Sequence, residues 1–243
     1  MTKEKKKFVY DWPMAAITVD GIVFGFDPSD EANPLKVLLI RRSDEPFKHH
    51  WALPGGYVNI GGNESLEAAV VREVEEETGA RFEYLEQLYT FGDPFRDPRG
   101  RVISVAYFAL VRKTDYEDIV GGDDADLAIW TSVNKLSRMR LAFDHKKILE
   151  MALNRLQGKI RYAPIGFNLL PTTFTLGQLQ QVYEAILQKK LDKANFRRRI
   201  ILMKILVRVG GAVRPKLGRP AQLYKFDQKE YDKAVQSGFN FEI

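Results

Sequence analysis

The densest group of residues suited to chemistry is an acidic run that contains Glu73, Glu76 and Glu77, spaced i, i+3 and i+4. In a helix, this spacing places all three carboxylates on one face. Like charges so placed repel one another, and a hard divalent cation, which prefers oxygen ligands, compensates them. The pattern therefore predicts a site for Mg²⁺, with Mn²⁺ as the alternative. Three glutamates taken alone are also typical of a solvated acidic face.

The residues before this run add a basic partner and a flexible loop. Arg72 directly precedes Glu73, and Glu64 lies eight residues before Arg72, which is about two helical turns. This spacing suits an ion pair that orients both side chains. Residues 54–62 include four glycines, whose backbone can approach a phosphate or a metal closely. These features together make a chance acidic face a poor explanation.

A helix must position these side chains, and the sequence predicts one over Ser65–Thr78. Leu66, Ala69, Val70 and Val74 recur on one face at helical spacing. Ser65 suits the N-cap, and the glycine that follows Thr78 stands where a C-terminal stop belongs. The apolar face of this helix would pack on a core and leave the glutamates on the other side.

The stretch from Gly56 to Ala80 resembles the Nudix box, G-x5-E-x7-R-E-U-x-E-E-x-G-U, in which U is an aliphatic residue. From Glu64 onward, the spacing and the charged residues match completely. The resemblance implies a domain that binds and hydrolyses a nucleoside diphosphate linked to another group. It implies catalytic roles for five residues, namely Glu64, Arg72, Glu73, Glu76 and Glu77. It also implies metal ligands at Glu73, Glu76, Glu77 and Gly56.

One departure from the Nudix pattern lies in the loop before the helix. Gly56 and Glu64 are separated by seven residues, where the family has five. The two additional residues fall where the loop shapes the metal and phosphate site. A displacement of about 1 Å at reacting groups can cost roughly 100-fold in rate. We therefore expect slow hydrolysis and a ligand affinity that is less affected.

Other segments of the first part are similar to the ADP-ribose-handling branch of the Nudix family. They are Trp51–Gly56, Phe91–Pro94, Arg96–Arg99 followed by Val102–Tyr107, and Leu141–His145. This resemblance implies that a nucleoside diphosphate sugar such as ADP-ribose binds here. The ligand-binding residues that it implies are Gly55, Gly56, Arg96 and Arg99.

The layout of the first part predicts an α+β fold, a Nudix α/β/α sandwich with mixed sheets. Strands are expected at residues 15–19, 21–26, 35–40, 102–111 and 127–131, and a second helix at 144–156. Residues 158–171 are rich in Pro and Gly and mark the best boundary. We predict a Nudix domain over residues 1–157 and a C-terminal winged helix-turn-helix domain over 158–243.

The second part differs sharply in charge. Residues 153–243 carry 17 Lys and Arg against 6 Asp and Glu, a balance of +11, whereas the rest of the chain carries −6. Such an asymmetry is typical of one domain for a small ligand and another for a polyanion. Helices are expected at 176–189, 193–199 and 201–207, followed by a hairpin over 209–226 and a last helix at 229–235. Helices followed by a two-stranded wing describe a winged helix.

The tail resembles the winged-helix domain of Nudix-related transcriptional regulators. The matching segments are Phe174–Leu176, Leu179–Gln180, Tyr183–Glu184, Leu191–Asp192, Asn195–Arg198 and Gly218–Tyr224. The resemblance implies binding to double-stranded DNA through Asn195, Arg197, Arg198 and Arg199 and, in the wing, through Arg214, Lys216 and Arg219. We expect a homodimer, because two half-sites give one small module useful specificity.

Composition excludes several other classes of protein. The chain has no cysteine, which removes disulfides, thiolate metal sites and cysteine nucleophiles. No apolar run approaches the roughly 20 residues of a membrane span, so we expect a cytoplasmic protein without a membrane partner. Two functions stay open: a ligand-responsive transcriptional regulator, and a Mg²⁺-dependent pyrophosphohydrolase whose tail serves dimerisation or stability. The sequence leaves open which nucleotide sugar and which operator are recognised.

Overall fold

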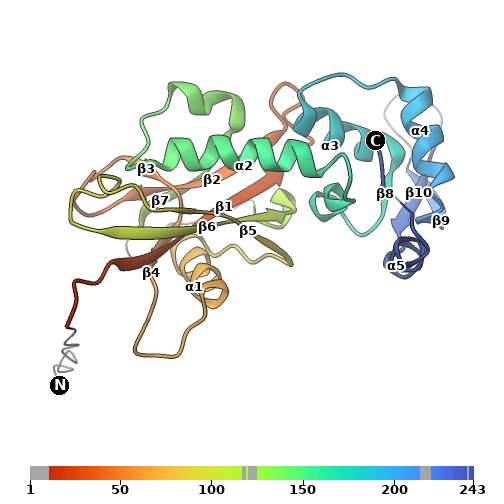
Figure 1. Cartoon of the computed structure of the whole chain (residues 1–243). Coiled ribbons are helices and arrows are strands. Elements are labelled where there is room, and N and C mark those ends of the chain that lie inside the picture. Colours follow the sequence, from red (N-terminus) through yellow and green to blue (C-terminus); the bar gives the residue numbers. More distant parts are fainter. Residues whose placement is uncertain (1–10, 117–118, 120–124, 214–219, 240) are drawn as a thin grey trace.

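The computed structural model describes residues 11–116, 119, 125–213, 220–239 and 241–243. Figure 1 shows a mixed sheet with α1 on one face and α2 on the other, and a smaller helical region beside them that ends in a hairpin and α5. The predicted α+β fold class is confirmed. Among the described residues, none of the helices combines the length and the apolar character that crossing a bilayer requires.

The first region consists mostly of β-strands, and the second is mostly helical. In the first region they are β1 (Ala16–Phe26), β2 (Leu35–Arg42), β3 (Trp51–Ala52), β4 (Gly55–Tyr57), α1 (Leu66–Thr78), β5 (Tyr84–Phe91), β6 (Val102–Val111), η1 (Lys113–Asp115), β7 (Ala125–Ser132), η2 (Val133–Arg138) and α2 (His145–Lys159). In the second they are η3 (Ile165–Leu169), β8 (Phe174–Thr175), α3 (Leu176–Leu187), α4 (Lys193–Leu202), β9 (Leu206–Val213), β10 (Ala221–Phe226) and α5 (Gln228–Gln236).

The large sheet has the order β3-β2-β1-β6-β5, with β4 also paired to β1 and β7 to β2. β1 runs parallel to β6, and its other pairings are antiparallel. The sequence predicts two strands at 15–19 and 21–26, but β1 is continuous. Gly21 lies beneath α1, because a Cβ at this position would come within 2.6 Å of the Val74 side chain. The absence of a side chain at Gly21 thus permits close helix–sheet packing rather than marking a turn.

The predicted Nudix-box helix is confirmed, including both of its ends. The Ser65 side chain accepts a hydrogen bond from the Ala68 amide, which caps the first turn. Gly79 ends the helix in the left-handed region, at φ 70°, and its N–H donates to the Glu75 carbonyl. The second predicted helix is present as α2 and runs about one turn further, so that the predicted boundary at 157/158 falls within its last turn.

In the second region, the sheet order is β8-β10-β9, and α3 and α4 precede the β9–β10 hairpin. The helix predicted at 201–207 is wrong: α4 continues to Leu202, and β9 begins at Leu206. Lys204 has φ 56°, which turns the chain, and Ile205 is buried. The pairing of β9 with β10 therefore overrides the helical tendency of this stretch.

The apolar core forms two clusters on opposite faces of the large sheet. One lies between the sheet and α1. The other lies between the sheet and α2 and continues through Leu156 and Ile160 to Tyr183 and Ile186 of α3. The two regions thus share one continuous core along α2. Trp12 belongs to neither cluster and is 79% exposed.

Candidate functional site

Arg72 is the centre of a carboxylate network on α1. Its Nε and Nη2 donate to the two oxygens of Glu64, at 2.7 and 3.0 Å, and the predicted orienting pair is present. Its Nη1 donates to Glu73 at 2.8 Å and to Glu76 at 3.0 Å. Hydrogen bonds from Arg72 lower the pKa of Glu64 to about 2. Burial raises the pKa of Glu73, although Arg72 opposes that shift.

The glycine loop packs directly against these carboxylates. Gly55 donates its N–H to Glu77 Oε2 at 2.8 Å, so Glu77 is turned inward and buried rather than aligned with the other two glutamates. A Cβ on Gly56 would lie 2.6 Å from the carboxyl carbon and both oxygens of Glu73. Only glycine leaves space between this backbone and the Glu73 carboxylate.

The space between the Gly56 backbone and the Glu73 carboxylate has the chemistry that a hard cation requires. The donors that meet there are carboxylate oxygens of Glu73 and Glu76 and the backbone beside Gly56. Within the described part of the chain, no three acidic or histidine side chains already form a metal cluster. Arg72 holds Glu73 and Glu76, and the Gly55 N–H holds Glu77. Mg²⁺ characteristically takes only one or two protein carboxylates and completes its shell with phosphates and water.

The two-residue loop insertion forms an exposed turn. Ile60 N–H donates to the Val58 carbonyl and Gly62 N–H to the Asn59 carbonyl, while Ile60 is 66% exposed. Glu64 reaches back to accept from the Asn59 amide at 2.9 Å. The turn projects outward while the Arg72–Glu64 pair and the Gly56–Glu73 contact are both present.

A cleft of about 420 Å³ opens beside the glycine loop. It is formed by β1, the end of β2, the glycine loop, α1, the 92–100 loop and the start of α2. Its lining contains six Asp and Glu residues and three arginines, Arg42, Arg96 and Arg99. This formal excess of negative charge would repel a bare diphosphate, so an anionic ligand needs the arginines and a cation together.

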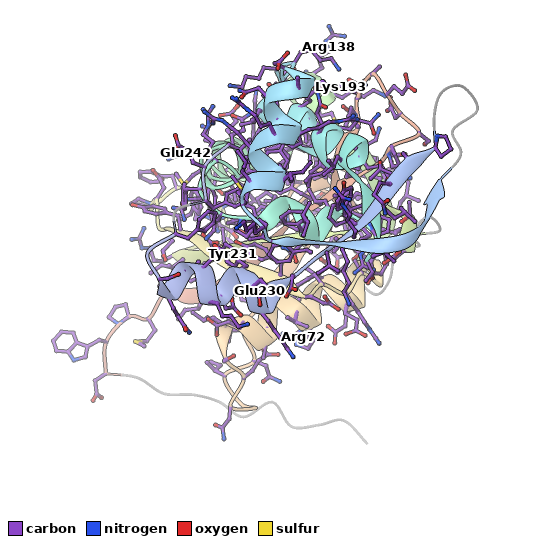
Figure 2. All side chains as sticks on the ribbon, turned by 90° about the vertical axis from the view of Figure 1, so that its right-hand side faces the viewer. Arg72, Arg138, Lys193, Glu230, Tyr231 and Glu242 are labelled. Atoms are coloured by element: carbon purple, nitrogen blue, oxygen red, sulfur yellow. The ribbon has the colours of Figure 1, made fainter. Side chains whose placement is uncertain are left out.

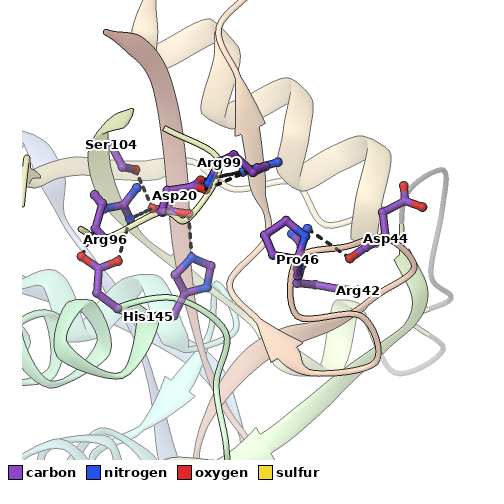
Figure 3. Close-up of polar contacts among 10 residues, drawn as sticks. Asp20, Arg42, Asp44, Pro46, Arg96, Arg99, Ser104 and His145 are labelled. Atoms are coloured by element: carbon purple, nitrogen blue, oxygen red, sulfur yellow. Dashed lines mark hydrogen bonds and ion pairs between the residues drawn. The ribbon is translucent and has the colours of Figure 1, made fainter. Parts of the chain in front are cut away.

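The inner wall of the cleft is a buried polar network around Asp20 (Figure 3). Asp20 accepts from Ser104, Arg96 Nη2 lies 3.4 Å from Asp20 Oδ2, and His145 Nε2 lies 3.4 Å from Oδ1. Arg96 also forms a bidentate pair with Asp144, at 2.7 and 3.1 Å. Arg96 is predicted to bind ligand, and it already has two carboxylate partners.

His145 holds the glycine loop to α2 in its neutral form. Its Nδ1 accepts a hydrogen bond from the Leu53 N–H at 2.9 Å, so the ring proton resides on Nε2, which faces Asp20. Burial lowers the pKa of His145, although Asp20 and Asp144 act in the opposite direction. The ring therefore acts as an acceptor on one side and a donor on the other.

Arg42 and Arg99 stand over the same aromatic ring at the open side of the cleft. Their guanidinium carbons lie 5.0 and 5.5 Å from the centroid of Phe143, and Arg99 is also 5.5 Å from that of Tyr57. Arg42 donates to the carbonyl of Pro46, and Arg99 pairs with Asp97 (Figure 3). Each guanidinium has a planar face against a ring and further N–H groups for a phosphate.

Sequence reasoning missed four of these residues, Asp20, Arg42, Phe143 and His145. The available signal was weak but present for three of them. Asp20 is a charged residue inside an otherwise apolar strand, and Phe143 and His145 lie in the segment that resembles the closing part of the ADP-ribose branch. Arg42 ends a strand beside a second arginine, and nothing in the sequence distinguishes the two.

The predicted DNA-binding residues of α4 divide between two sides of the helix. Asn195, Arg198 and Arg199 are exposed, and Arg198 Nη2 donates to Asn195 Oδ1 at 3.1 Å. Arg197 is half-buried beside Gly177 at the start of α3, and its Nε has no hydrogen-bond partner among the described residues. Figure 2 looks onto this end of the molecule, with Lys193 at the start of α4 and Glu230 and Tyr231 on α5 below. Arg214, Lys216 and Arg219 lie outside the described residues.

Known proteins match both regions of this chain. Residues 17–152 match the model of the NUDIX domain, and residues 166–226 match the NrtR DNA-binding winged helix domain. The chain is 38% identical over 233 residues to the ADPR responsive transcriptional repressor NtrR of Acinetobacter baylyi. The aligned residues cover 95% of this chain and 87% of the relative. The chain belongs to the NrtR family of Nudix-related regulators.

Two further relatives represent the domains in different combinations. The crystal structure of Shewanella oneidensis NrtR complexed with a 27mer DNA is 34% identical, has a TM-score of 0.78 and covers 93% of this chain and 97% of that one. An ADP-ribose pyrophosphatase of Methanocaldococcus jannaschii is 41% identical over 151 residues, 60% of this chain and 76% of the relative. The predicted family and the predicted fold of both domains are confirmed. Membership in a Nudix family also implies dependence on a divalent cation.

Proposed function

We propose that this NrtR-family protein is a ligand-responsive transcriptional regulator that binds ADP-ribose in the Nudix cleft and double-stranded DNA through the winged helix. One observation carries the proposal: the same chain contains both a cleft lined by three arginines and an exposed basic helix. The 38% identical relative is named for a response to ADPR, and it matches nearly the whole chain. The cytoplasmic location stays a prediction.

In the cleft, we assign diphosphate binding to Arg42 and Arg99. Both present guanidinium groups beside Phe143, and both rest on groups of the chain that hold them in place. Arg96, on the inner wall, is the third phosphate partner that we assign, and the Gly55 and Gly56 backbone borders the same space. Charge-assisted hydrogen bonds from arginine to phosphate have the bidentate geometry that such a ligand requires.

Glu73 and Glu76, with the backbone of Gly56, would hold the cation, for which Mg²⁺ is the first candidate and Mn²⁺ the second. Glu77 would support this set through Gly55 rather than as a direct ligand in its present position. When bound, the cation supplies charge neutralisation of the diphosphate and activation of a water. Arg72 orients both carboxylates and holds Glu64 ionised.

Hydrolysis of the bound diphosphate is the second candidate function. Arg72 contacts three of the four glutamates of the box pattern, Glu64, Glu73 and Glu76, and the archaeal relative is named as a pyrophosphatase. Glu76 is the most exposed of the three glutamates that contact Arg72, with 45% of its side chain accessible. It is the carboxylate with most freedom to accept a proton from a reacting water.

At the winged helix, Asn195, Arg198 and Arg199 form the exposed surface of α4 that would meet DNA. We assign the wing residues Arg214, Lys216 and Arg219 to phosphate contacts on the basis of charge alone. Arg197 would act differently, by anchoring α4 on the start of α3. A homodimer presenting two such helices would read two half-sites about one helical turn apart.

The direct test measures binding of the purified protein to the DNA upstream of its own gene, at several salt concentrations, with and without ADP-ribose. We expect specific binding whose affinity falls steeply with salt and changes when ADP-ribose is added. Calorimetry with ADP-ribose and Mg²⁺ measures ligand binding independently of DNA binding. Absence of DNA binding at low salt would exclude the regulator and leave the hydrolase function alone.

A further inference from the structure

Asp144 occupies the N-cap position of α2 but does not cap the helix. The structure describes five α-helices, and the N-cap side chains of the other four accept a backbone N–H of the first turn: Ser65, Thr175, Asp192 and Asp227. Those four residues have extended backbone conformations, whereas Asp144 has φ −96° and ψ 17°. Asp is among the most favourable N-cap residues, so the side chain has a second place available to it.

The group that withdraws Asp144 from the cap is Arg96, a residue of the cleft. Arg96 is almost fully buried and forms two hydrogen bonds with the Asp144 carboxylate. The other two arginines of the cleft are held locally: Arg99 by Asp97, two residues away, and Arg42 by the carbonyl of Pro46. Among these pairings, only the one between Arg96 and Asp144 connects the ligand cleft to a helix that leads out of the domain.

Helix α2 connects this contact with the winged helix. Figure 1 shows α2 running along the sheet toward α3. Its first residue, His145, holds the glycine loop through Leu53, and its end packs into the core that continues into α3. A Cβ on Gly166 of η3 would lie 3.1 to 3.5 Å from Tyr183, Ile160 and Val182, so η3 packs closely against both the end of α2 and α3. Tightly packed interfaces transmit a shift rather than absorb it.

We propose that Asp144 is a two-position switch, paired with Arg96 in the unliganded protein and capping α2 when a nucleoside diphosphate takes Arg96 as a phosphate partner. The proposal rests on the proposed function, since it assigns the route by which the ligand alters DNA affinity. A diphosphate competes with Asp144 for the same N–H donors of Arg96. Release turns the Asp144 backbone to the extended conformation of the other caps and moves the start of α2 relative to the cleft wall.

The substitution Asp144→Asn distinguishes the position paired with Arg96 from the position that caps α2. Asparagine caps a helix as well as aspartate does, but it lacks the charge that pairs with Arg96. The variant therefore favours the capped position without ligand. Glu75→Gln is the matched control, because it removes a carboxylate from Arg81, outside the cleft, and has no described contact with α2.

The experiment measures the DNA affinity of the full chain by fluorescence anisotropy, without and with saturating ADP-ribose, for the wild type and both variants. We expect the unliganded Asp144→Asn protein to match the liganded wild type, with a response to ADP-ribose below about twofold, while Glu75→Gln keeps the wild-type response. If Asp144→Asn responds as strongly as the wild type, the switch is wrong. If both variants lose the response, the effect is not specific to Asp144 and the switch is again wrong.

A measurement on the wild type keeps the proposal testable if Asp144→Asn fails to fold. Hydrogen exchange should change on addition of ADP-ribose at the first turn of α2, residues 145–148, as the new cap forms. Unchanged exchange there in a protein that binds ADP-ribose and alters its DNA affinity would overturn the switch alone. If ADP-ribose does not change the DNA affinity of the wild type, both the proposed function and the switch are overturned.

Discussion

The arginines of the cleft and those of α4 show two ways of presenting the same side chain. In the cleft, Arg96 and Arg99 are bound by carboxylates of their own chain and are partly or wholly withdrawn from solvent, as is Arg72 on the neighbouring helix α1. On α4, Arg198 and Arg199 are exposed, and Arg198 contacts only a neutral amide among the partners described for it. A ligand in the cleft must therefore compete for its arginines, whereas a polyanion at α4 only displaces water and counterions.

This difference determines what each region does well. Paired, buried charges are fixed in geometry, so they discriminate between ligands and respond to them by changing partners. Exposed cations on a helix attract any phosphate backbone and lose much of that attraction as salt rises. The cleft is thus suited to sensing one small molecule, and α4 to holding an extended polymer.

The largest expected effect concerns the acidic face of α1 beside the cleft. Glu76→Gln keeps the shape of the side chain but removes its charge and its ionic contact with Arg72, so any hydrolysis of ADP-ribose should fall by orders of magnitude. Turnover with Mg²⁺ is the measurement. Glu75→Gln, on the same helix but paired with Arg81, is the control and should retain activity. Unchanged turnover in Glu76→Gln would remove this residue from the catalytic set.

The next effect tests whether the cleft arginines bind the diphosphate. Arg42→Ala should weaken ADP-ribose about 10- to 100-fold, since a hydrogen bond to a charged group contributes about 1.5–3 kcal/mol. Its neighbour Arg41 is exposed on the same strand, so Arg41→Ala is a matched control with little expected effect. Calorimetry measures both. Equal loss in the two variants would point to general charge rather than to a specific contact.

At α4 the comparison predicts opposite results for adjacent arginines. Arg198→Ala should weaken DNA binding by several-fold and reduce the slope of log affinity against log salt by about one, if it contacts a phosphate. Arg197→Ala should leave that slope unchanged and lower the thermal stability, because its side chain packs beside the start of α3. Salt titrations and melting curves measure the two outcomes. A reduced slope for Arg197→Ala would place that guanidinium on the DNA.

The smallest effect is a pH dependence that arises from His145. Its pKa is lowered in the folded protein, so the unfolded chain takes up a proton before the folded protein does. The stabilising contribution is therefore complete above the unfolded pKa of about 6.5 and declines as the pH falls below that value. His145→Asn keeps an acceptor for the Leu53 N–H but cannot titrate. Urea midpoints at pH 7 and pH 5 should differ less in this variant than in the wild type; an equal difference would assign the dependence to other groups.

Local patterns were sufficient for the Nudix-box helix and for the choice of family. The interval from Glu64 to Gly79 contains its own cap, its own stop and an ion pair between residues eight apart, and all of these depend on contacts within one helix and its flanking loop. The same holds for α3, whose capping box lies within four residues. Such features can be read from sequence because the interacting residues are neighbours along the chain.

The inner wall of the cleft and the ending of α4 depended on distant residues. Asp20, Arg96 and Asp144 lie up to 124 residues apart in the chain and meet only because β1 pairs with β6 and α2 crosses the sheet. Likewise, Ile201 to Val207 has helical composition, but pairing with strand β10 places its last two residues in a sheet. Sequence determined which charges this protein carries and the local caps of α1 and α3. The tertiary structure decided which arginine each carboxylate holds, because that choice depends on burial and on distances between elements remote in sequence.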